Sequence, residues 1–323
     1  MERPATGDSL AARWRAVAGW QGQDGYAIGV CGDLRVKMLV TGCTGQLGRE
    51  LKRSLACLGE VVACDRQQLD LADPDALRSS VRAIAPDAII NAAAYTAVDK
   101  AESDPAAADA INALAPGILA EEAKRLGALL IHYSTDYVFD GIKAAAYNEE
   151  DTPAPLSAYG RSKLAGERAI TASTARHLIF RTSWVYGLYG ANFMKTMLRL
   201  ARERDELRVV DDQVGAPTWS RHLADATALL LSRREIPDGL FHLAAAGETS
   251  WHGYAEAIFR EAQRGGLLDR SPVVHRIASA DYRLPAPRPA NSRLDCRRFR
   301  VTFGVALPDW RIGLADCLAD ARF

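Results

Sequence analysis

The feature that most constrains this chain is a glycine-spaced stretch, KMLVTGCTGQLGRELKRSL, which occupies residues 37–55. It begins with the apolar run 38–40, which is typical of a buried parallel strand. Leu47, Leu51 and Leu55 then recur at helical spacing and predict an amphipathic helix. We expect its outer face to carry the polar side chains Arg49, Glu50, Lys52 and Arg53. The glycines therefore lie in the turn between a strand and a helix.

Gly42, Gly45 and Gly48 mark this turn with the spacing G-x-x-G-x-x-G. We expect Gly42 to allow the tight turn, Gly45 to leave room for phosphate groups and Gly48 to let the helix pack closely on the strand. The N–H groups and positive dipole end of such a helix can hold a nucleotide pyrophosphate. A second strand over residues 60–64 ends at Asp65, whose carboxylate can accept hydrogen bonds from an adenosine ribose. The stretch therefore predicts a dinucleotide site.

Strand and helix patterns alternate from residue 36 to about residue 180, which predicts an α/β fold with a Rossmann-type, doubly wound parallel sheet. Ligands bind such sheets outside the carboxyl ends of the strands. After the helix at the glycine turn, we expect a helix that starts at Asp73–Pro74 and is ended by Pro86–Asp87. The later helices that we expect in this region are 98–112, 115–127 and about 157–171.

The alternation weakens over residues 181–323. We expect this part to form mainly a smaller C-terminal α/β substrate lobe, interleaved with the NAD(P)-binding domain of residues 36–180. Residues 1–35 show no signal-peptide pattern and are expected to be a disordered or mis-assigned leader. The natural start is then expected at or near Met38.

The composition argues against several classes of protein. The 323 residues carry a formal net charge of +0, so no long-range field recruits nucleic acid or an anionic membrane. No apolar run is long enough to cross a bilayer. The six cysteines form no CxxC pair and no cluster with metal spacing, which indicates no metal site and favours a cytoplasmic location. They are Cys31, Cys43, Cys57, Cys64, Cys296 and Cys317.

Three residues predict carbonyl reduction at the ligand-binding edge of the sheet. Tyr159 and Lys163 are four residues apart on a predicted helix and therefore share a face. A nearby ammonium group is expected to help the tyrosine ionise, which suits a general acid that delivers a proton to a carbonyl. Thr135 follows the strand predicted over residues 128–133 and can donate to the same oxygen. The pair alone is common by chance, but the glycine turn and Thr135 together with it favour catalysis.

With these motifs in one chain, the sequence resembles the extended short-chain dehydrogenase/reductases, and within them the dTDP-4-dehydrorhamnose reductase family. The resemblance covers about residue 38 to the end of the chain. The stretches that carry it are TGCTGQLG from Thr41, NAAAYTAVDKAE from Asn91, STDYVFDG from Ser134, APLSAYGRSKLAGE from Ala154, FRTSWVYG from Phe180, NFMKTMLRLA from Asn192, DDQVGAPT from Asp211 and RPANSRLD from Arg288. Related sugar-nucleotide 4,6-dehydratases carry a glutamate where this chain has Tyr137, and a reductase needs no such elimination base.

The resemblance implies NAD(P)H-dependent reduction of the C4 ketone of dTDP-4-dehydro-β-L-rhamnose to dTDP-L-rhamnose, the last step of dTDP-rhamnose synthesis for cell-surface polysaccharide. Tyr159 is expected to give the proton, Thr135 to polarise the carbonyl and Lys163 to hold the cofactor ribose. The cofactor contacts that it implies, besides Tyr159 and Lys163, are Gly42, Gly45, Gln46, Leu47, Gly48, Asp65, Asp70, Leu71, Ala93, Ala94, Tyr95 and Tyr133. The implied contacts to the dTDP-sugar are Thr96, Thr135, Asp136, Trp184, Arg288 and Asn291.

The choice of cofactor and the oligomeric state stay open at this point. Asp65 would repel a 2′-phosphate and favours NADH, whereas the adjacent Arg66 can pair with one, so we expect both NADH and NADPH to be used. Some members of the family dimerise through a magnesium ion held by glutamates. Glu50 matches one such position, but Arg221 stands at a second, where a cation disfavours the metal. We therefore expect no structural magnesium and a monomer or weak homodimer.

Two other functions fit the same motifs. One is a reductase or epimerase of another 4-keto sugar nucleotide, which differs only in the pocket around Thr96, Asp136 and Trp184. The other is a non-catalytic regulatory subunit of the methionine adenosyltransferase type, which resembles this reductase family. The complete set of Thr135, Tyr159 and Lys163 argues for catalysis, because a binding module needs none of their chemistry.

Overall fold

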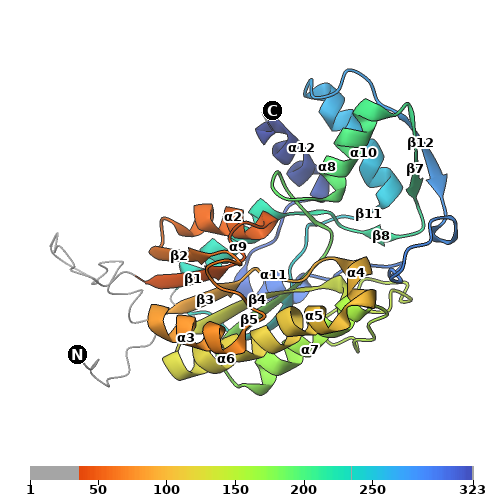
Figure 1. The fold of residues 1–323 in the computed structure, drawn as a ribbon. Coiled ribbons are helices and arrows are strands. Elements are labelled where there is room, and N and C mark those ends of the chain that lie inside the picture. Colours follow the sequence, from red (N-terminus) through yellow and green to blue (C-terminus); the bar gives the residue numbers. More distant parts are fainter. Residues whose placement is uncertain (1–35, 234, 322–323) are drawn as a thin grey trace, which may run out of the picture.

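The computed structural model describes residues 36–233 and 235–321 of the chain. Figure 1 shows a parallel sheet covered by helices on both faces and, beyond one end of it, a smaller group of helices and short strands. We call this smaller group, built around α8, α10 and α12, the C-terminal lobe. The predicted leader, residues 1–35, and Cys31 within it lie outside the described residues.

The main sheet has six parallel strands in the order β10-β5-β4-β3-β1-β2. They are β1 (Lys37–Thr41), β2 (Glu60–Cys64), β3 (Ala88–Asn91), β4 (Leu129–Thr135), β5 (His177–Thr182) and β10 (Gly239–His242). The strand order reverses between β1 and β3, and open α/β sheets bind ligands at such a reversal, outside the carboxyl ends of the strands. The predicted Rossmann-type doubly wound sheet is confirmed, and β10 joins it from far along the chain.

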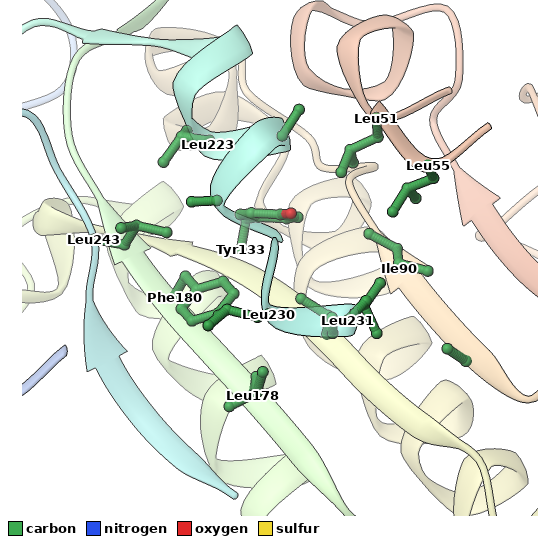
Figure 2. Close-up of a cluster of buried hydrophobic side chains, with 14 of the residues drawn as sticks. Leu51, Leu55, Ile90, Tyr133, Leu178, Phe180, Leu223, Leu230, Leu231 and Leu243 are labelled. Atoms are coloured by element: carbon green, nitrogen blue, oxygen red, sulfur yellow. The ribbon is translucent and has the colours of Figure 1, made fainter. Parts of the chain in front are cut away.

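Helices cover the two faces of the sheet (Figure 1). One face carries α2 (Gln46–Leu55), α9 (Ser220–Leu231) and α11 (Arg297–Phe303), and the other carries α3 (Pro74–Ile84), α6 (Ala115–Leu126) and α7 (Ala158–Ala172). Figure 2 shows how leucines of α2 and α9 gather over Ile90, Tyr133 and Phe180 of the strands. This core holds the strands, and therefore their carboxyl ends, in place.

The helix at the glycine turn forms as predicted, with one exception on its outer face. Leu47, Leu51 and Leu55 are buried in the core of the sheet. Glu50, expected to be exposed, is only 1% exposed. Its carboxylate is buried because Arg53 and Arg221 both donate to it.

The single helix expected over residues 98–112 is wrong, because the chain breaks at Asp104. The structure has α4 (Val98–Ser103) and α5 (Pro105–Asp109), followed by a π-helical stretch (Ala110–Leu114) that runs into α6. Pro105 lacks the N–H that would continue α4, and the Asp104 carboxylate caps α5 by accepting from the Ala107 N–H. The break turns α5 against α7, the helix that carries Tyr159.

The C-terminal lobe contains α8 (Phe193–Glu203), α10 (Trp251–Arg264) and α12 (Trp310–Asp320) around a second hydrophobic core. The short strand pairs are β6 (Val185–Tyr186) with β9 (Thr218–Trp219), β7 (Glu206–Val210) with β12 (Val273–Ile277), and β8 (Val214–Gly215) with β11 (Thr249–Ser250). Two 3-10 turns span Asp136–Val138 and Ser279–Asp281. Among the helices of the described ranges, none is both long and apolar enough to cross a bilayer.

Candidate active site

The glycine turn between β1 and α2 lies at the carboxyl end of β1, beside the reversal of strand order. Gly42 has a φ of +68°, and a Cβ there would lie 2.8 Å from the Ala93 Cα, so a tight left-handed turn passes directly against the end of β3. A Cβ on Gly48 would overlap the Gly42 carbonyl oxygen. A Cβ on Gly45 would meet only that oxygen, at 3.3 Å. The tight turn predicted at Gly42 is confirmed. Gly48 lets the helix pack closely on the Gly42–Cys43 turn rather than on the strand itself, and Gly45 borders open space.

The N-terminus of α2 fits an anionic group. Gly45 is the N-cap residue, no side chain caps the helix, and the first turn carries no acidic residue. The backbone N–H groups of this turn and the helix dipole therefore point at the space beside Gly45. Gln46 faces the C-terminal lobe, where its Oε1 accepts from the Asn192 side chain at 2.8 Å. Leu47 has its side chain in the core, so only its backbone can reach a ligand.

Acidic and basic groups both lie at the end of β2. The Asp65 carboxylate oxygen Oδ1 accepts from the N–H groups of Gln67 and Gln68, at 2.9 and 3.1 Å. Arg66 has 80% of its side chain exposed and lies 4.0 Å from Asp70. The side chain of Leu71 is buried in the core on the α3 face, so a ligand can meet only its backbone. This end can accept a ribose hydroxyl or approach a phosphate with Arg66.

The segment after β3 is braced by Asn112, a residue that the sequence analysis missed. Its side chain accepts from the Tyr95 N–H at 2.8 Å and donates to the Tyr95 carbonyl and the Ser162 hydroxyl, each at 3.0 Å. Asn112 lies on the π-helical stretch and is 1% exposed. It therefore fixes the Ala93–Tyr95 segment relative to α7. No local pattern marks it, because it was expected near the end of an ordinary helix.

The end of β4 and the first turns of α7 bring three predicted residues together. Thr135 donates to Asp136 at 3.1 Å and forms a side-chain hydrogen bond with the Tyr159 phenol. The N-cap Ser157 starts α7 just before Tyr159, by accepting from the Gly160 N–H. Threonine, carboxyl and phenol therefore converge at the carboxyl edge of the sheet.

Burial makes Tyr159 a weaker acid than the sequence analysis expected. Desolvation raises the pKa of its phenol to about 12, the hydrogen bond with the Thr135 hydroxyl lowers this pKa and the Asp136 charge raises it. The expected lowering by Lys163 is wrong for this arrangement, because the Lys163 Nζ donates elsewhere. It contacts the Tyr133 carbonyl at 2.6 Å and the His132 Nε2 at 3.1 Å. A phenol with this pKa stays protonated at neutral pH and can serve as a proton donor.

Lys163 itself is buried, at 1% exposure. Desolvation lowers the pKa of its ammonium group to about 8, and the nearby Glu167 raises it. Tyr133, predicted as a cofactor contact, holds Lys163 through its carbonyl oxygen, while its side chain lies in the core and bonds Thr227 at 2.6 Å. Because the Tyr133 ring points to α9, only the backbone of Tyr133 can take part in the predicted cofactor contact.

Glu167, one turn beyond Lys163, is a second residue that the sequence analysis missed. Its carboxylate accepts two hydrogen bonds from the Arg181 guanidinium, at 2.9 and 2.6 Å, and one from the Ser134 hydroxyl. All three side chains are buried. This pair ties α7 to β4 and β5, so it fixes the depth at which Tyr159 and Lys163 lie over the sheet.

Comparison with known proteins decides the family. Residues 36–323 match the family described as the RmlD substrate binding domain. The chain is 49% identical to the dTDP-4-dehydrorhamnose reductase of Burkholderia thailandensis, over 88% of this chain and 99% of that protein. It is 47% identical to the enzyme of the same name from Escherichia coli strain K12, over 88% of this chain and 97% of that protein. The chain belongs to the dTDP-4-dehydrorhamnose reductase family.

A solved structure agrees with this assignment to the dTDP-4-dehydrorhamnose reductase family. The Bacillus anthracis dTDP-4-dehydrorhamnose reductase, in complex with NADP, superposes with a TM-score of 0.84 at 34% identity and covers 89% of this chain and 100% of its own. The Thermus thermophilus UDP-glucose 4-epimerase, at 18% identity and a TM-score of 0.75, shares the fold. The resemblance expected from the sequence motifs is therefore confirmed.

The residues that the family resemblance assigns to the sugar nucleotide differ in solvent exposure and in their contacts. Thr96 is exposed and Asp136 lies beside Tyr159. Trp184 has a φ of 48° and stacks on Trp251 of α10, with ring centroids 3.6 Å apart. This left-handed backbone conformation is uncommon for a bulky residue, and it turns the indole toward the C-terminal lobe.

The other two, Arg288 and Asn291, have partners within the protein. The Arg288 guanidinium donates to both carboxylate oxygens of Asp99, each at 2.8 Å. Asn291 donates to the Lys143 and Ala145 carbonyls, at 2.6 and 2.8 Å, and its own oxygen accepts from Arg293. The structure does not support a contact between the Asn291 side chain and the diphosphate, because these hydrogen bonds within the loop already occupy its amide group.

At the position where the resemblance implies a metal in some family members, the side chains form an ion pair. The Arg221 Nε lies 3.1 Å from the buried Glu50 carboxylate, and Arg221 also pairs with Asp320 of α12. Within the described ranges, no group of three or more histidine, cysteine, aspartate or glutamate side chains is arranged to hold a metal ion. The arginine takes the place that a cation would need.

Proposed function

We propose that this chain reduces the C4 ketone of dTDP-4-dehydro-β-L-rhamnose to dTDP-L-rhamnose with NADH or NADPH, as the last step of dTDP-rhamnose synthesis. The observation that carries the proposal is the convergence of Thr135, Asp136 and Tyr159 beside buried Lys163, at the edge where the glycine turn lies. Membership of the reductase family, at up to 49% identity to the relatives named above, supports the substrate.

Each residue of this site has a distinct part in the proposal. A bound reduced nicotinamide supplies the hydride that the ketone carbon accepts. Thr135 donates a hydrogen bond to the ketone oxygen and so draws electron density from the carbon. Tyr159 gives the proton to that oxygen, which its phenol, with a pKa raised to about 12, still carries at neutral pH. Lys163, one turn after Tyr159 on α7, would hold the ribose of the cofactor.

The cofactor site is proposed to run from the glycine turn to Lys163. The N-terminus of α2 would hold the pyrophosphate, and Asp65 or Arg66 the adenosine ribose or its 2′-phosphate. Ala93, Ala94 and Tyr95 would line the space between them. The uncapped helix start and the open space beside Gly45 fit such a group. Because both charges flank the ribose end, we propose that NADH and NADPH both serve.

The division into domains, the cellular location and the oligomeric state are also proposals. We propose a NAD(P)-binding domain over residues 36–180 and a substrate lobe mainly over 181–323, supported by the two separate hydrophobic cores. We propose a cytoplasmic location, which suits the free thiols of all five cysteines in the described ranges. The Glu50–Arg221 pair supports a monomer or a weak homodimer rather than a dimer held by magnesium.

The proposal is tested by assaying NADPH and NADH oxidation with dTDP-4-dehydro-L-rhamnose made in place by the preceding enzymes. The expected result is stoichiometric formation of dTDP-L-rhamnose, identified by chromatography and mass. The same assay is run with other nucleotide 4-keto sugars. Faster turnover of one of these would move the substrate to that sugar. Absence of turnover with every keto sugar, with cofactor bound, would support a regulatory subunit instead.

A further inference from the structure

A row of buried polar side chains crosses three strands and ends at Lys163. Thr41, Asn91 and His132 are paired in register on β1, β3 and β4. The Thr41 hydroxyl lies 2.7 Å from the Asn91 Oδ1, and the Asn91 Nδ2 lies 3.0 Å from the His132 Nδ1. The other ring nitrogen, Nε2, lies 3.1 Å from the Lys163 Nζ. All four residues are at most 1% exposed, so these groups have no bulk water as an alternative partner.

The hydrogen bonds of this row run in one direction. The Ala93 N–H donates to the Thr41 hydroxyl at 3.4 Å, and that hydroxyl donates to the Asn91 oxygen. The Asn91 amide then donates to the His132 Nδ1. A ring nitrogen that accepts carries no proton, so a neutral ring has its proton on Nε2. The Nε2–H group then faces Lys163, and only a neutral amine has the lone pair to accept it.

The opposite direction, with Lys163 charged, satisfies the groups of the row except the Thr41 O–H group, which loses Asn91 as its acceptor. An ammonium group donates to Nε2, so the ring proton must sit on Nδ1. The Nδ1–H group then needs an acceptor, which Asn91 provides when its amide is turned by half a turn. The two patterns differ in the charge of Lys163, which exchanges one proton with its surroundings. The ring keeps one proton in both and only changes the nitrogen that carries it.

We propose that His132 is a positioning residue for the reduction, and that the row Thr41–Asn91–His132 couples the charge of Lys163 to the tautomer of the His132 ring. The inference rests on the proposed function for the role of Lys163, but the coupling itself needs no bound cofactor. It also ties Lys163 to the glycine turn, because Thr41 directly precedes Gly42 and shares its hydroxyl with the Ala93 N–H.

The charges around Lys163 allow both patterns near neutral pH. Glu167 of the same helix faces Lys163 and is itself paired with Arg181 of β5. His132 of β4 is its nearest titratable neighbour, and the pKa of that ring is held well below its usual value, first by burial and then by the charge of Lys163. Tyr159 shares its face of α7, and its phenol stays protonated. The ring therefore stays neutral while Lys163 titrates.

The test is to follow the ring nitrogens of His132 by ¹⁵N NMR of the cofactor-free full chain between about pH 6 and pH 10. The signals are assigned by their loss in His132→Gln or, should that variant not fold, through the backbone resonances. The expected result is the Nδ1–H tautomer at low pH and the Nε2–H tautomer at high pH, with the change near the pKa of Lys163, about 8. One tautomer throughout this range would overturn the proposal.

Three variants separate the coupling from general structural effects. In Lys163→Met the change of tautomer should disappear, and its persistence would overturn the proposal. In Asn91→Asp the carboxylate can only accept, so it should hold the Nδ1–H tautomer to a pH at least one unit higher than in the wild type. Asn148→Asp, in a surface turn, makes the same exchange away from the row and should leave the change in place.

A separate measurement connects the row to the reaction. The dissociation constant of NADPH, followed by fluorescence against pH, should stay low to higher pH in Asn91→Asp, because Lys163 remains charged. If the tautomer change moved to higher pH in Asn91→Asp but the pH dependence of the NADPH dissociation constant did not, the row would have no effect on cofactor binding. Because the NMR result needs no turnover, its failure is distinguishable from failure of the proposed function.

Discussion

At the scale of single residues, the site holds polar groups in environments that do not favour their charged forms. Asp136 is 3% exposed, and desolvation raises the pKa of its carboxyl to about 6, although Ser292 and Thr135 hydrogen bonds lower it. The ordinary pKa of an aspartate carboxyl is 3.8. The folded state therefore binds this proton more tightly than the unfolded state does, and ionised Asp136 costs stability.

Asp136→Asn is expected to stabilise the chain at neutral pH while reducing activity. The cost of the ionised carboxyl is fully present above about pH 6 and is relieved as the pH falls from there toward 3.8. The gain at pH 7.5 should be on the order of 3 kcal/mol and should vanish near pH 4. Urea unfolding of the wild type and of Asp136→Asn at several pH values measures this difference in the free energy of unfolding.

Asp140→Asn is the matched control for this prediction. A hydrogen bond from Tyr147 is the largest cause that lowers the pKa of the Asp140 carboxyl, so its ionised form is favoured by folding. The change should therefore destabilise the chain at neutral pH, with the loss fading below the ordinary value of an aspartate. Effects of the same sign at both positions would contradict this account of the site.

Asp65→Ala is expected to separate the two cofactors. The Asp65 carboxylate is held at the end of β2 by two backbone N–H groups, where a ribose 2′-hydroxyl would meet it. Removing it should raise the dissociation constant of NADH several-fold and that of NADPH less, because a carboxylate repels the 2′-phosphate of NADPH. Fluorescence titration with both cofactors measures this, and equal changes would remove Asp65 from the ribose site.

The candidate catalytic residues are marked by patterns in the sequence, whereas most of the partners that hold them are not. Thr135, Tyr159 and Lys163 carry a motif with local spacing. His132, Asn112 and Glu167 act through contacts with residues that are far away in the sequence, such as Asn91, Tyr95 and Arg181. The direction of the Tyr159 pKa was missed for the same reason, since burial is a property of the folded site.

At the scale of elements, helix and strand bounds in the first half of the chain lie within a residue or two of the patterns, except where local chemistry interrupts them. The Asp104–Pro105 step breaks one expected helix. The π-helical stretch after it cannot be recognised from the spacing of its hydrophobic residues. That stretch places Asn112 against the segment after β3. A Cβ on Gly166 of α7 would overlap the Asn112 carbonyl oxygen, so the two elements pack in direct contact.

Asn112→Ala is expected to destabilise the fold and to weaken cofactor binding together. It leaves the half-buried Tyr95 N–H and carbonyl without their side-chain partners, which should cost about 1–3 kcal/mol. The segment that would line the cofactor also loses its brace, so the dissociation constant of NADPH should rise. Denaturant unfolding and fluorescence titration measure the two effects.

Asn148→Ala provides the comparison for Asn112. Its side chain accepts from two backbone N–H groups in an exposed turn, so its loss should cost less than about 1 kcal/mol and leave cofactor affinity unchanged. If Asn112→Ala behaved like Asn148→Ala in both measurements, the bracing role would be wrong.

At the scale of the whole molecule, the sequence pattern of alternating strands and helices predicts the parallel sheet. It does not predict that segments from the second half of the chain come back to join this sheet. β10, α9 and α11 come from the second half and complete the sheet and its upper face (Figure 1). β10 is a short strand without a distinctive pattern. Arg221 joins these parts, since it pairs with Glu50 of α2 and with Asp320 of α12.

Arg221→Ala is expected to cost about 2–4 kcal/mol, because the Glu50 carboxylate, 1% exposed, would keep only Arg53 as a partner. Arg199→Ala is the control, because its pair with Glu203 on α8 is exposed and should be worth less than about 0.5 kcal/mol. Thermal unfolding of the two variants measures the difference. Equal, small losses would contradict a buried ion pair between α2 and α9.

The central claim is that Tyr159 gives the proton to the ketone, and one measurement tests it most directly. Turnover of dTDP-4-dehydro-L-rhamnose with NADPH is compared for wild type, Tyr159→Phe and Tyr254→Phe. Tyr254 is buried in the C-terminal lobe core, so its variant controls for loss of a hydroxyl elsewhere. The account predicts a loss of kcat of about 10²–10⁴-fold for Tyr159→Phe alone, with NADPH affinity retained. Retained turnover in Tyr159→Phe would contradict it.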